Sequence, residues 1–207
     1  MSSARGTPKP PLPGLEKTKV PSLPLAGGVF YRCARKDRPL VDWDNRPTSR
    51  FSHPGLPFPV LYLAPSKHTA FWECFGDELN DQVPEDRGLS EHSLEVRQWV
   101  KFIIPPLAAF DASDPPALRA VGADGGTFLA PYSITQQWAK FLMEDPPTFD
   151  GLQYRSRLDS NQKCLAVFGR PKFQAMNAIV ATVVGDLLND ADFLRWLEAE
   201  EIDLIPG

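Results

Sequence analysis

Short apolar runs, rich in β-branched and aromatic residues, alternate with long polar stretches along this chain. Each run is five or six residues long and is bounded by Gly, Pro or charged residues, which is typical of strands. One run stops at Pro105-Pro106, whose missing N–H groups cannot continue a ladder of hydrogen bonds. The pattern predicts strands at residues 29–34, 60–64, 99–104, 152–156, 164–168 and 179–184.

Apolar residues at helical spacing predict a helix that begins after Ser66 and runs to about Leu79. Ser66 is a suitable N-cap because its hydroxyl can accept a hydrogen bond from a backbone N–H of the first turn. The apolar stripe of this helix consists of Ala70, Phe71, Cys74, Phe75 and Leu79. Further helices are expected after Pro115-Pro116, from a cap at Ser133 to Met143, and, as an acidic amphipathic helix, from Leu187 to about Glu201.

The order of these elements predicts an α+β fold. There is no internal repeat, and strands and helices do not alternate regularly as they do in a parallel doubly wound sheet. Six of the 22 prolines fall within the first 28 residues. We therefore expect residues 1–28 to form an extended N-terminal arm outside the core. Residues 29–207 are expected to form a single domain that ends in the acidic helix.

Composition places the chain among globular proteins, with 23% charged and 43% hydrophobic residues. The net charge of −4 is opposite to that of a nucleic-acid-binding surface, so no direct nucleic-acid partner is expected. No apolar run approaches the roughly 20 residues that span a bilayer. Three separated cysteines and three histidines form no spaced ligand set, so no metal site is expected. Together with the lack of a secretory leader, these thiols predict a cytoplasmic protein.

The common catalytic motifs do not occur in the sequence, which contains no GxGxxG, GxxxxGKS/T, GxSxG or HExxH. The remaining candidates are polar residues near the ends of predicted elements. Each also has an ordinary structural explanation, such as a solvated side chain, a core aromatic or a turn residue. By themselves they leave the function open. These candidates are Arg32, Arg50, Tyr62, Glu73 and Ser156, the last flanked by Arg155 and Arg157.

The order of these residues resembles the RES-domain family, which is named for an Arg, a Glu and a Ser that recur in this order. The Arg is either Arg32, at the end of the first predicted strand, or Arg50 in the following loop. The Glu and the Ser are Glu73 and Ser156. The resemblance covers roughly residues 29–168 and rests on the segments Tyr31-Arg32, Ser49-Arg50-Phe51, Tyr62-Leu63-Ala64, Ala70-Phe71-Trp72-Glu73, Gln136-Gln137-Trp138, Gly151-Leu152 and Tyr154-Arg155-Ser156-Arg157.

The chain departs from the family pattern in one turn. Where the family tends to have Gly-Gly-Arg-aromatic-Asn, this sequence has Thr48-Ser49-Arg50-Phe51-Ser52. The glycines and the Asn of that turn are therefore replaced. The Pro-rich arm and the acidic terminal helix also lie outside the common core.

The resemblance implies a mixed-sheet, ADP-ribosyltransferase-like core with flanking helices and a cleft for NAD. Family members are toxins of bacterial toxin–antitoxin pairs that cleave the nicotinamide–ribose bond of NAD by phosphorolysis or hydrolysis, or that transfer ADP-ribose to a protein. It thus implies NAD as substrate, inorganic phosphate as an acceptor, a cognate antitoxin as partner, a homodimer as one assembly, and no metal. A non-catalytic NAD-binding module and an interaction protein built around the Pro-rich arm remain the alternatives.

The resemblance also implies roles for these residues, with Glu73, Arg32 and Tyr62 as catalytic residues. Glu73 would stabilise the positive charge that develops on the ribose, and Tyr62 would contact the nicotinamide–ribose end. Because Glu73 lies opposite the apolar stripe and beside Trp72, we expect its face of the helix to be covered rather than solvated. The residues implied to bind NAD or the acceptor phosphate through their charges and hydroxyls are Arg32, Arg50, Tyr62, Ser156, and Arg157 or Arg155.

Overall fold

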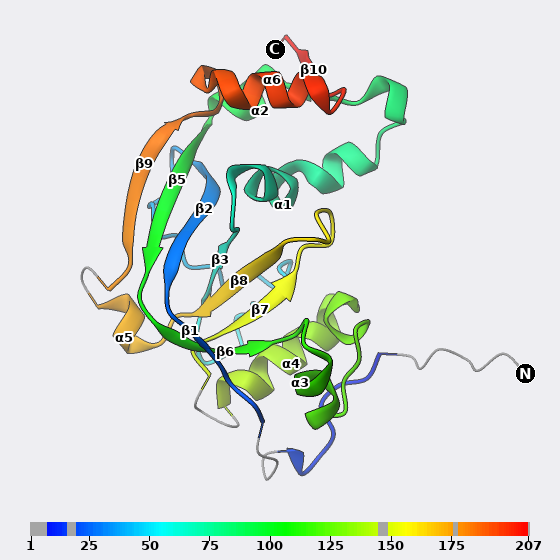
Figure 1. The fold of residues 1–207 in the computed structure, drawn as a ribbon, viewed down its shortest axis with the longest axis vertical. Helices are drawn as coiled ribbons and strands as arrows, with labels where there is room; N and C mark the ends of the chain where they lie inside the picture. Colours follow the sequence, from blue (N-terminus) through cyan, green and yellow to red (C-terminus); the bar gives the residue numbers. More distant parts are fainter. Residues whose placement is uncertain (1–7, 16–19, 145–148, 176–177, 207) are drawn as a thin grey trace, which may run out of the picture.

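The computed structural model describes residues 8–15, 20–144, 149–175 and 178–206. Two sheets share one apolar core, and helices pack on the other face of the larger sheet (Figure 1). The helices α6 (Ala191–Ala199) and α2 (Glu91–Glu95) lie at one end of the molecule, and α3 (Pro115–Ala120) and α4 (Tyr132–Glu144) lie at the other. The combination of a mixed sheet with flanking helices confirms the predicted α+β class.

The larger sheet has the strand order β1-β6-β7-β8-β3. β6 and β7 run parallel, whereas the other neighbours run antiparallel. Side chains alternate between its faces, so that Leu61 and Leu63 point toward the smaller sheet while Val60 and Tyr62 lie on the helix-covered face. Its strands are β1 (Leu23–Leu25), β6 (Leu107–Asp111), β7 (Gly151–Arg155), β8 (Lys163–Phe168) and β3 (Val60–Leu63).

The smaller sheet consists of β2 (Gly28–Arg35), β5 (Arg97–Ile104) and β9 (Val180–Asp186), all antiparallel. Its strand β2 meets the end of β3, because Tyr31 and Ala64 exchange two backbone hydrogen bonds of 2.7 and 2.9 Å. This junction brings the polar end of β2 close to the loops that flank β3.

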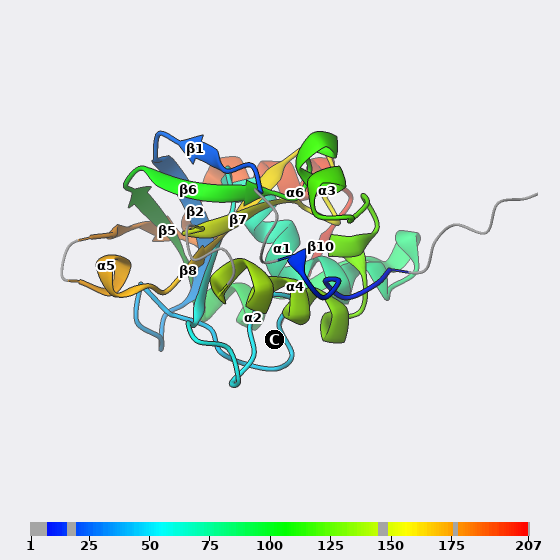
Figure 2. The ribbon, with the colours of Figure 1, turned by 90° about the horizontal axis from the view of Figure 1, so that it is seen from below.

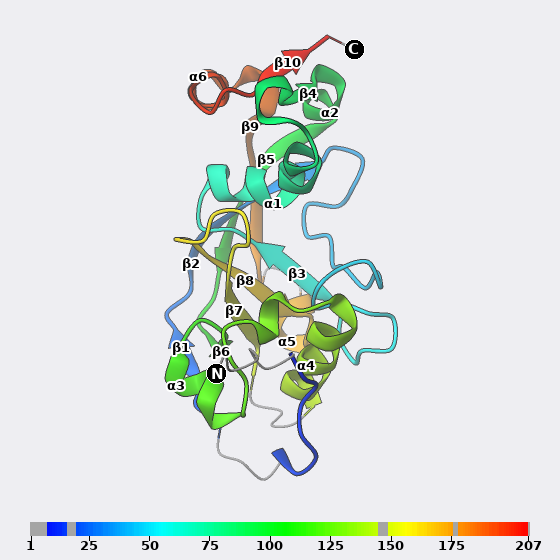
Figure 3. The same ribbon diagram turned by 90° about the vertical axis from the view of Figure 1, so that its right-hand side faces the viewer.

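Three helices are central to the site or its support: α1 (Lys67–Asn80), α4 (Tyr132–Glu144) and α6 (Ala191–Ala199). Figure 3 shows α1 between β3 and the end of the molecule that carries α6. The remaining elements are α2 (Glu91–Glu95), α3 (Pro115–Ala120), α5 (Pro171–Gln174), the 3₁₀ turns η2 (Pro84–Asp86), η3 (Thr127–Leu129) and η4 (Leu187–Asn189), and the parallel pair β4 (Gly88–Ser90) and β10 (Asp203–Ile205).

The strands predicted from the apolar runs all occur, with ends that differ by at most two residues. The predicted cap is also confirmed, since the Ser66 hydroxyl accepts a hydrogen bond from the N–H of Thr69 at 3.1 Å. No helix in the described ranges is long and apolar enough to cross a membrane.

The expectation that the N-terminal arm lies outside the core is wrong for residues 20–25. Val20 is buried, and β1 pairs with β6, a strand that the sequence pattern did not predict (Figure 2). Pro24 is tolerated because β1 is the edge strand of its sheet. Residues 1–7 and 16–19 of the arm lie outside the described ranges.

Two predicted helix boundaries need correction. The acidic segment from Leu187 forms a 3₁₀ turn and a separate helix, because Asp190 is an extended residue whose carboxylate accepts a hydrogen bond from the N–H of Phe193 and caps α6. In α4 the helix already begins at Tyr132, so Ser133 lies inside it rather than at its cap.

Candidate functional site

A cleft of about 440 Å³ lies between the end of β2, the loop after it, β3 and α1. Of the residues proposed as site residues from the sequence, it contains all except Ser156 and Arg155. The side chains from these elements include Arg32, Arg50, Tyr62, Glu73 and Arg157. Residues separated by more than 120 positions thus meet at one place.

The cleft is positively charged although the whole chain carries a net charge of −4. Five arginines line it against three carboxylates, an excess of two positive charges. Such a concave, cationic surface attracts anionic ligands. The charged residues are Arg32, Arg46, Arg50, Arg97 and Arg157, and Asp44, Glu73 and Asp77.

Glu73 projects from α1 and is fixed from one side by two hydroxyl groups. The Ser156 hydroxyl donates to its Oε1 at 2.6 Å, and the Tyr154 hydroxyl donates to its Oε2 at 3.3 Å. The residue nevertheless remains exposed to solvent in the cleft. Its carboxylate is therefore oriented by the protein and still accessible.

The expectation of a covered helix face is wrong for Glu73 and correct for its neighbour. Trp72 packs edge-on against Trp196 of α6, with ring centroids 6.1 Å apart. One residue further along, a helix turns by about 100°, so Glu73 faces the cleft instead of α6. Cys74, assigned to the apolar stripe, is exposed as well and also lines the cleft.

Ser156 lies behind Glu73 and not in the cleft wall. It is 1% exposed, and its hydroxyl both donates to Glu73 and accepts from the N–H of Asp159 at 3.1 Å. It follows β7 directly, whose Tyr154 supplies the second hydroxyl. In this structure Ser156 therefore orients the carboxylate, whereas the sequence led us to expect a direct contact with the ligand.

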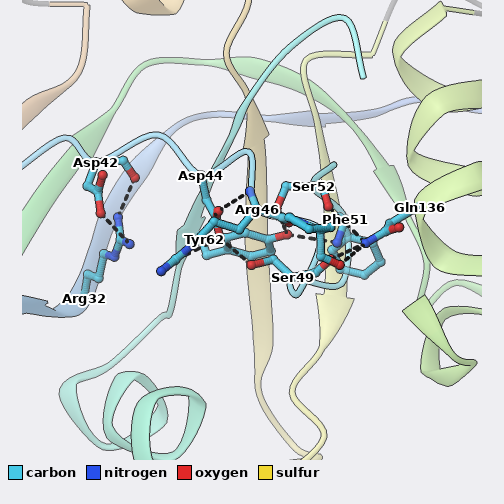
Figure 4. Close-up of polar contacts among 10 residues, drawn as sticks. Arg32, Asp42, Asp44, Arg46, Ser49, Phe51, Ser52, Tyr62 and Gln136 are labelled. Carbon is cyan, nitrogen blue, oxygen red and sulfur yellow. Dashed lines mark hydrogen bonds and ion pairs between the residues drawn. The ribbon is translucent and has the colours of Figure 1, made fainter. Parts of the chain in front are cut away.

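Arg32 is held by the loop after β2. Its Nη1 donates to the carbonyl oxygen of Asp42 at 2.8 Å, and its Nη2 lies 3.7 Å from the Asp42 carboxylate. Burial lowers the pKa of this guanidinium, and the neighbouring carboxylates partly offset the effect. Figure 4 shows Arg32 and Asp42 to one side of a second group of polar contacts, which surrounds Asp44 and Tyr62.

The turn that carries Arg50 is anchored by α4. The Nε2 of Gln136 lies 2.8, 2.9 and 3.1 Å from the carbonyl oxygens of Pro47, Ser49 and Ser52, which share its two N–H donors (Figure 4). Thr135 donates to the carbonyl oxygen of Arg50 at 2.6 Å. Within the Gln136-Gln137-Trp138 segment, Gln136 thus has a structural function, which is to fix the backbone of this turn together with Thr135.

The glycines of the family's turn are not required here. Among the described non-glycine residues only Glu201 has a positive φ, so Thr48 and Ser49 adopt ordinary backbone conformations. The Arg50 guanidinium carbon lies 5.9 Å from the ring centroids of both Phe51 and Tyr154. These aromatic faces orient the guanidinium toward the cleft.

Tyr62 supports the same turn. Its hydroxyl accepts from the N–H of Phe51 at 2.9 Å and hydrogen-bonds to the Ser52 hydroxyl at 3.2 Å. Burial raises its pKa well above the usual range, so the hydroxyl stays neutral. Tyr62 lines the cleft, while its hydroxyl is hydrogen-bonded to Phe51 and Ser52.

Asp44 is a cleft residue that the sequence analysis missed. Its carboxylate accepts from the Arg46 side chain at 2.9 Å and from the Ser49 hydroxyl at 2.5 Å. Burial raises the pKa of this carboxyl, but the hydrogen bonds from Arg46 and Ser49 outweigh burial and hold the pKa below its usual value. The segment Asp44-Asn45-Arg46 lies within the long loop between β2 and β3, and nothing in its pattern distinguishes it from other polar loop residues.

The remaining arginines occupy different places. Arg157 lines the cleft and pairs with Asp77 of α1, whereas Arg155 bonds to the carbonyl oxygen of Ser160 and lines a second cavity. Arg97, also missed from the sequence, enters the cleft from β5 and stacks over the Phe75 ring at 4.9 Å. Only the strand register places Arg97 here, opposite Arg35 of β2.

Comparisons with known proteins agree with this architecture. A chain in the crystal structure of the M. tuberculosis MbcT–MbcA toxin–antitoxin complex is similar in fold, with a TM-score of 0.56 at 17% sequence identity. The similarity covers 79% of this chain and 86% of that one. A search of curated protein sequences finds no match. The family model of the RES domain matches residues 29–187. The chain therefore belongs to the RES-domain family.

Proposed function

We propose that this chain binds NAD in the cleft and cleaves its nicotinamide–ribose bond, by phosphorolysis or by hydrolysis. One observation carries the proposal: in a RES-family chain, the Glu73 carboxylate is oriented by two hydroxyls and remains open toward an arginine-lined cleft. The volume of about 440 Å³ lies within the range of small-molecule sites.

The arginines of the cleft suit the pyrophosphate of NAD and an acceptor phosphate. Guanidinium groups bind phosphate oxygens through paired, charge-assisted hydrogen bonds, and Arg32 and Arg50 are the two that we assign to the pyrophosphate. Arg50 forms no ion pair within the described part of the chain, so its N–H donors are available. Arg157, already paired with Asp77, is the candidate for an acceptor phosphate.

Glu73 acts on the reacting centre in this proposal. Nicotinamide leaves as a neutral base, and positive charge develops on the ribose as the bond breaks. A carboxylate held beside that carbon stabilises the charge most in the transition state, which is the condition for rate acceleration. Ser156 and Tyr154 fix the carboxylate in advance, so that it does not have to reorient during the reaction.

The proposal includes the role of a toxin in a toxin–antitoxin pair. It is supported by the family and by the likeness in fold to a chain of a toxin–antitoxin complex. Because uncontrolled loss of NAD would kill the host cell, we expect a cognate antitoxin that closes the cleft. Expression of the chain alone in bacteria should lower cellular NAD and arrest growth, and Glu73→Gln should remove both effects.

The biochemical test is incubation of the purified protein with NAD, with and without inorganic phosphate, followed by mass spectrometry. ADP-ribose-1″-phosphate formed only with phosphate shows phosphorolysis, and ADP-ribose in both buffers shows hydrolysis. Glu73→Gln should lower turnover on the order of 10²–10³-fold. The matched control is Glu78→Gln, an exposed residue of the same helix outside the cleft lining.

Other outcomes would change the assignment. ADP-ribose attached to an added protein would identify a transferase. NAD that binds but stays intact would indicate a non-catalytic module, and a calorimetric titration without any NAD binding would contradict the proposal as a whole.

A further inference from the structure

Two of the three cysteines lie in the cleft, each directly after a proposed catalytic residue. Cys33 follows Arg32 on β2 and is buried, whereas Cys74 follows Glu73 on α1 and is exposed. Both line the cleft. Cys164 of β8, by contrast, is buried in the core, and burial raises the pKa of its thiol well above the usual value.

The two cleft thiols lie on neighbouring elements, since α1 packs against β2, and their pKa values shift in opposite directions. A hydrogen bond with Cys33 lowers the pKa of the Cys74 thiol, and the nearby Arg97 and Arg32 lower it further, against the effects of burial and of Glu78. Burial raises the pKa of Cys33. These shifts favour a thiolate at the exposed Cys74 and a protonated thiol at the buried Cys33.

Arg97 completes this cluster. Its guanidinium lies over the Phe75 ring, and its buried Nε has no hydrogen-bond partner among the described residues. A cation with an unsatisfied donor, placed near an accessible sulfur, stabilises negative charge there. Low-pKa, solvent-accessible cysteines that have a second cysteine within reach are the ones that respond to oxidants.

We propose that Cys74 is an oxidation site and that Cys33 resolves its oxidised form as a disulfide between β2 and α1, in the wall of the cleft. Hydrogen peroxide is the oxidant. The Cys74 thiolate attacks one peroxide oxygen and breaks the O–O bond, which gives a sulfenic acid and, after protonation, one water. The Cys33 sulfur then attacks the Cys74 sulfur, its proton leaves with the hydroxyl group as a second water, and the S–S bond forms.

This disulfide would restrain both elements that carry the proposed catalytic residues. Arg32 and Glu73 each adjoin a bonded cysteine, so a small displacement of either backbone moves a charged group in the cleft. We expect turnover of NAD to fall at least tenfold on oxidation and to return after reduction. This effect on turnover rests on the proposed function, whereas formation of the disulfide does not.

The test treats the purified protein with a few equivalents of hydrogen peroxide, blocks remaining thiols, and maps the peptides by mass spectrometry without reduction. A linked pair of peptides that contain Cys33 and Cys74, with a mass lower by about 2 Da for the two hydrogens lost, is expected. Cys164→Ser should give the same product, and Cys164 should stay reduced in the wild type. Because peptide mapping requires no activity, its result is independent of whether the chain consumes NAD.

Two variants separate the steps. Cys74→Ser, at an exposed position, should abolish oxidation at this dose, and Cys33→Ser should leave Cys74 as a sulfenic acid that dimedone traps. If Cys164 reacts as fast as Cys74, or if no linked Cys33–Cys74 peptide forms while Cys74 is oxidised, the proposal is overturned.

Discussion

The cleft has two polar regions that are built differently. In the turn from Asp44 to Ser52, the Asp44 carboxylate and several backbone groups are paired within the protein, through Arg46, Tyr62 and Gln136. At Glu73, the protein supplies two hydroxyls from one side and leaves the carboxylate exposed. The first region is a rigid support, and the second presents a reactive group.

This difference separates residues that position others from residues that meet the substrate. A group whose hydrogen bonds are all taken up by the protein has little left to offer a ligand, whereas an oriented and open group does. By this criterion Tyr62, Gln136 and Ser156 are positioning residues. Glu73 and Arg50 are open to the substrate, which Arg32 also contacts in the proposed function.

Among the residues that position others, Ser156 should have the largest effect, because it supports Glu73. Ser156→Ala deletes the hydroxyl that donates at 2.6 Å, so kcat for NAD should fall about 10²-fold while KM changes little, because a small misplacement of a catalytic group costs that much. In the Glu73→Gln background the same substitution should have almost no further effect, since it acts through the carboxylate. The exposed Ser160→Ala is the control in the same turn.

A direct contact between Ser156 and the substrate would give a different result. The double variant would then lose additional activity, and KM would rise. Either observation would remove Ser156 from the positioning group.

Gln136→Ala should have the next largest effect, and it acts on the turn from Asp44 to Ser52. Three carbonyl oxygens lose their common donor, so the turn loosens and Arg50 is no longer held. We expect the affinity for NAD to fall about tenfold, or about 1.4 kcal/mol, and the free energy of unfolding to fall by about 1–3 kcal/mol. Calorimetric titration and urea unfolding measure the two quantities.

Gln137→Ala provides the matched control for that experiment. Gln137 is the adjacent residue of α4, it is exposed, and its side chain bonds to the Ser133 carbonyl oxygen of its own helix. If both substitutions weaken NAD binding equally, the turn is not what Gln136 supports.

The fold could be predicted from the sequence wherever local signals and packing agreed. The apolar runs before Pro105 and after Gly151, and the capped helix after Ser66, all occur as expected. β1 and β6 were missed because β1 contains a proline and β6 follows one. Both strands depend on pairing with distant segments, which no local pattern encodes. Asp190 divides the last helix by a capping contact that hydrophobic periodicity does not reveal.

That most of the candidate residues lie together could be predicted from the sequence, whereas the contacts of each could not. Arg32, Arg50, Tyr62, Glu73 and Arg157 do meet in one cleft. The burial of Ser156 and the presence of Tyr154 and Arg97 depend on strand register and on how α1 packs against β7 and β5, which are tertiary properties. The sequence also could not show that Cys74 leaves the apolar stripe for the cleft.

Asp44 offers a smaller effect, which depends on pH. Its pKa is lowered in the folded protein, so its pairing stabilises the fold above the pKa of about 3.9 that an unfolded Asp has, and this stability is lost as the pH falls through the folded pKa. Asp44→Asn should lower the free energy of unfolding by about 1–2 kcal/mol at pH 7. The difference from the wild type should shrink below about pH 4. Urea unfolding at pH 7 and pH 3 tests this, and an equal difference at both pH values would exclude ionised Asp44 as the source.

Tyr62→Phe should have the smallest effect and therefore tests the comparison most sharply. The ring remains in the cleft wall, and only the hydroxyl that serves Phe51 and Ser52 is lost. We expect unfolding to become easier by about 1 kcal/mol, with a change in NAD turnover of no more than about threefold, because the turn keeps its bonds to Gln136 and Thr135. Steady-state kinetics beside urea unfolding separate the two effects. A loss of turnover as large as that of Ser156→Ala, without a matching loss of stability, would mean that the hydroxyl meets the substrate, and Tyr62 would then belong with Glu73 rather than with the support.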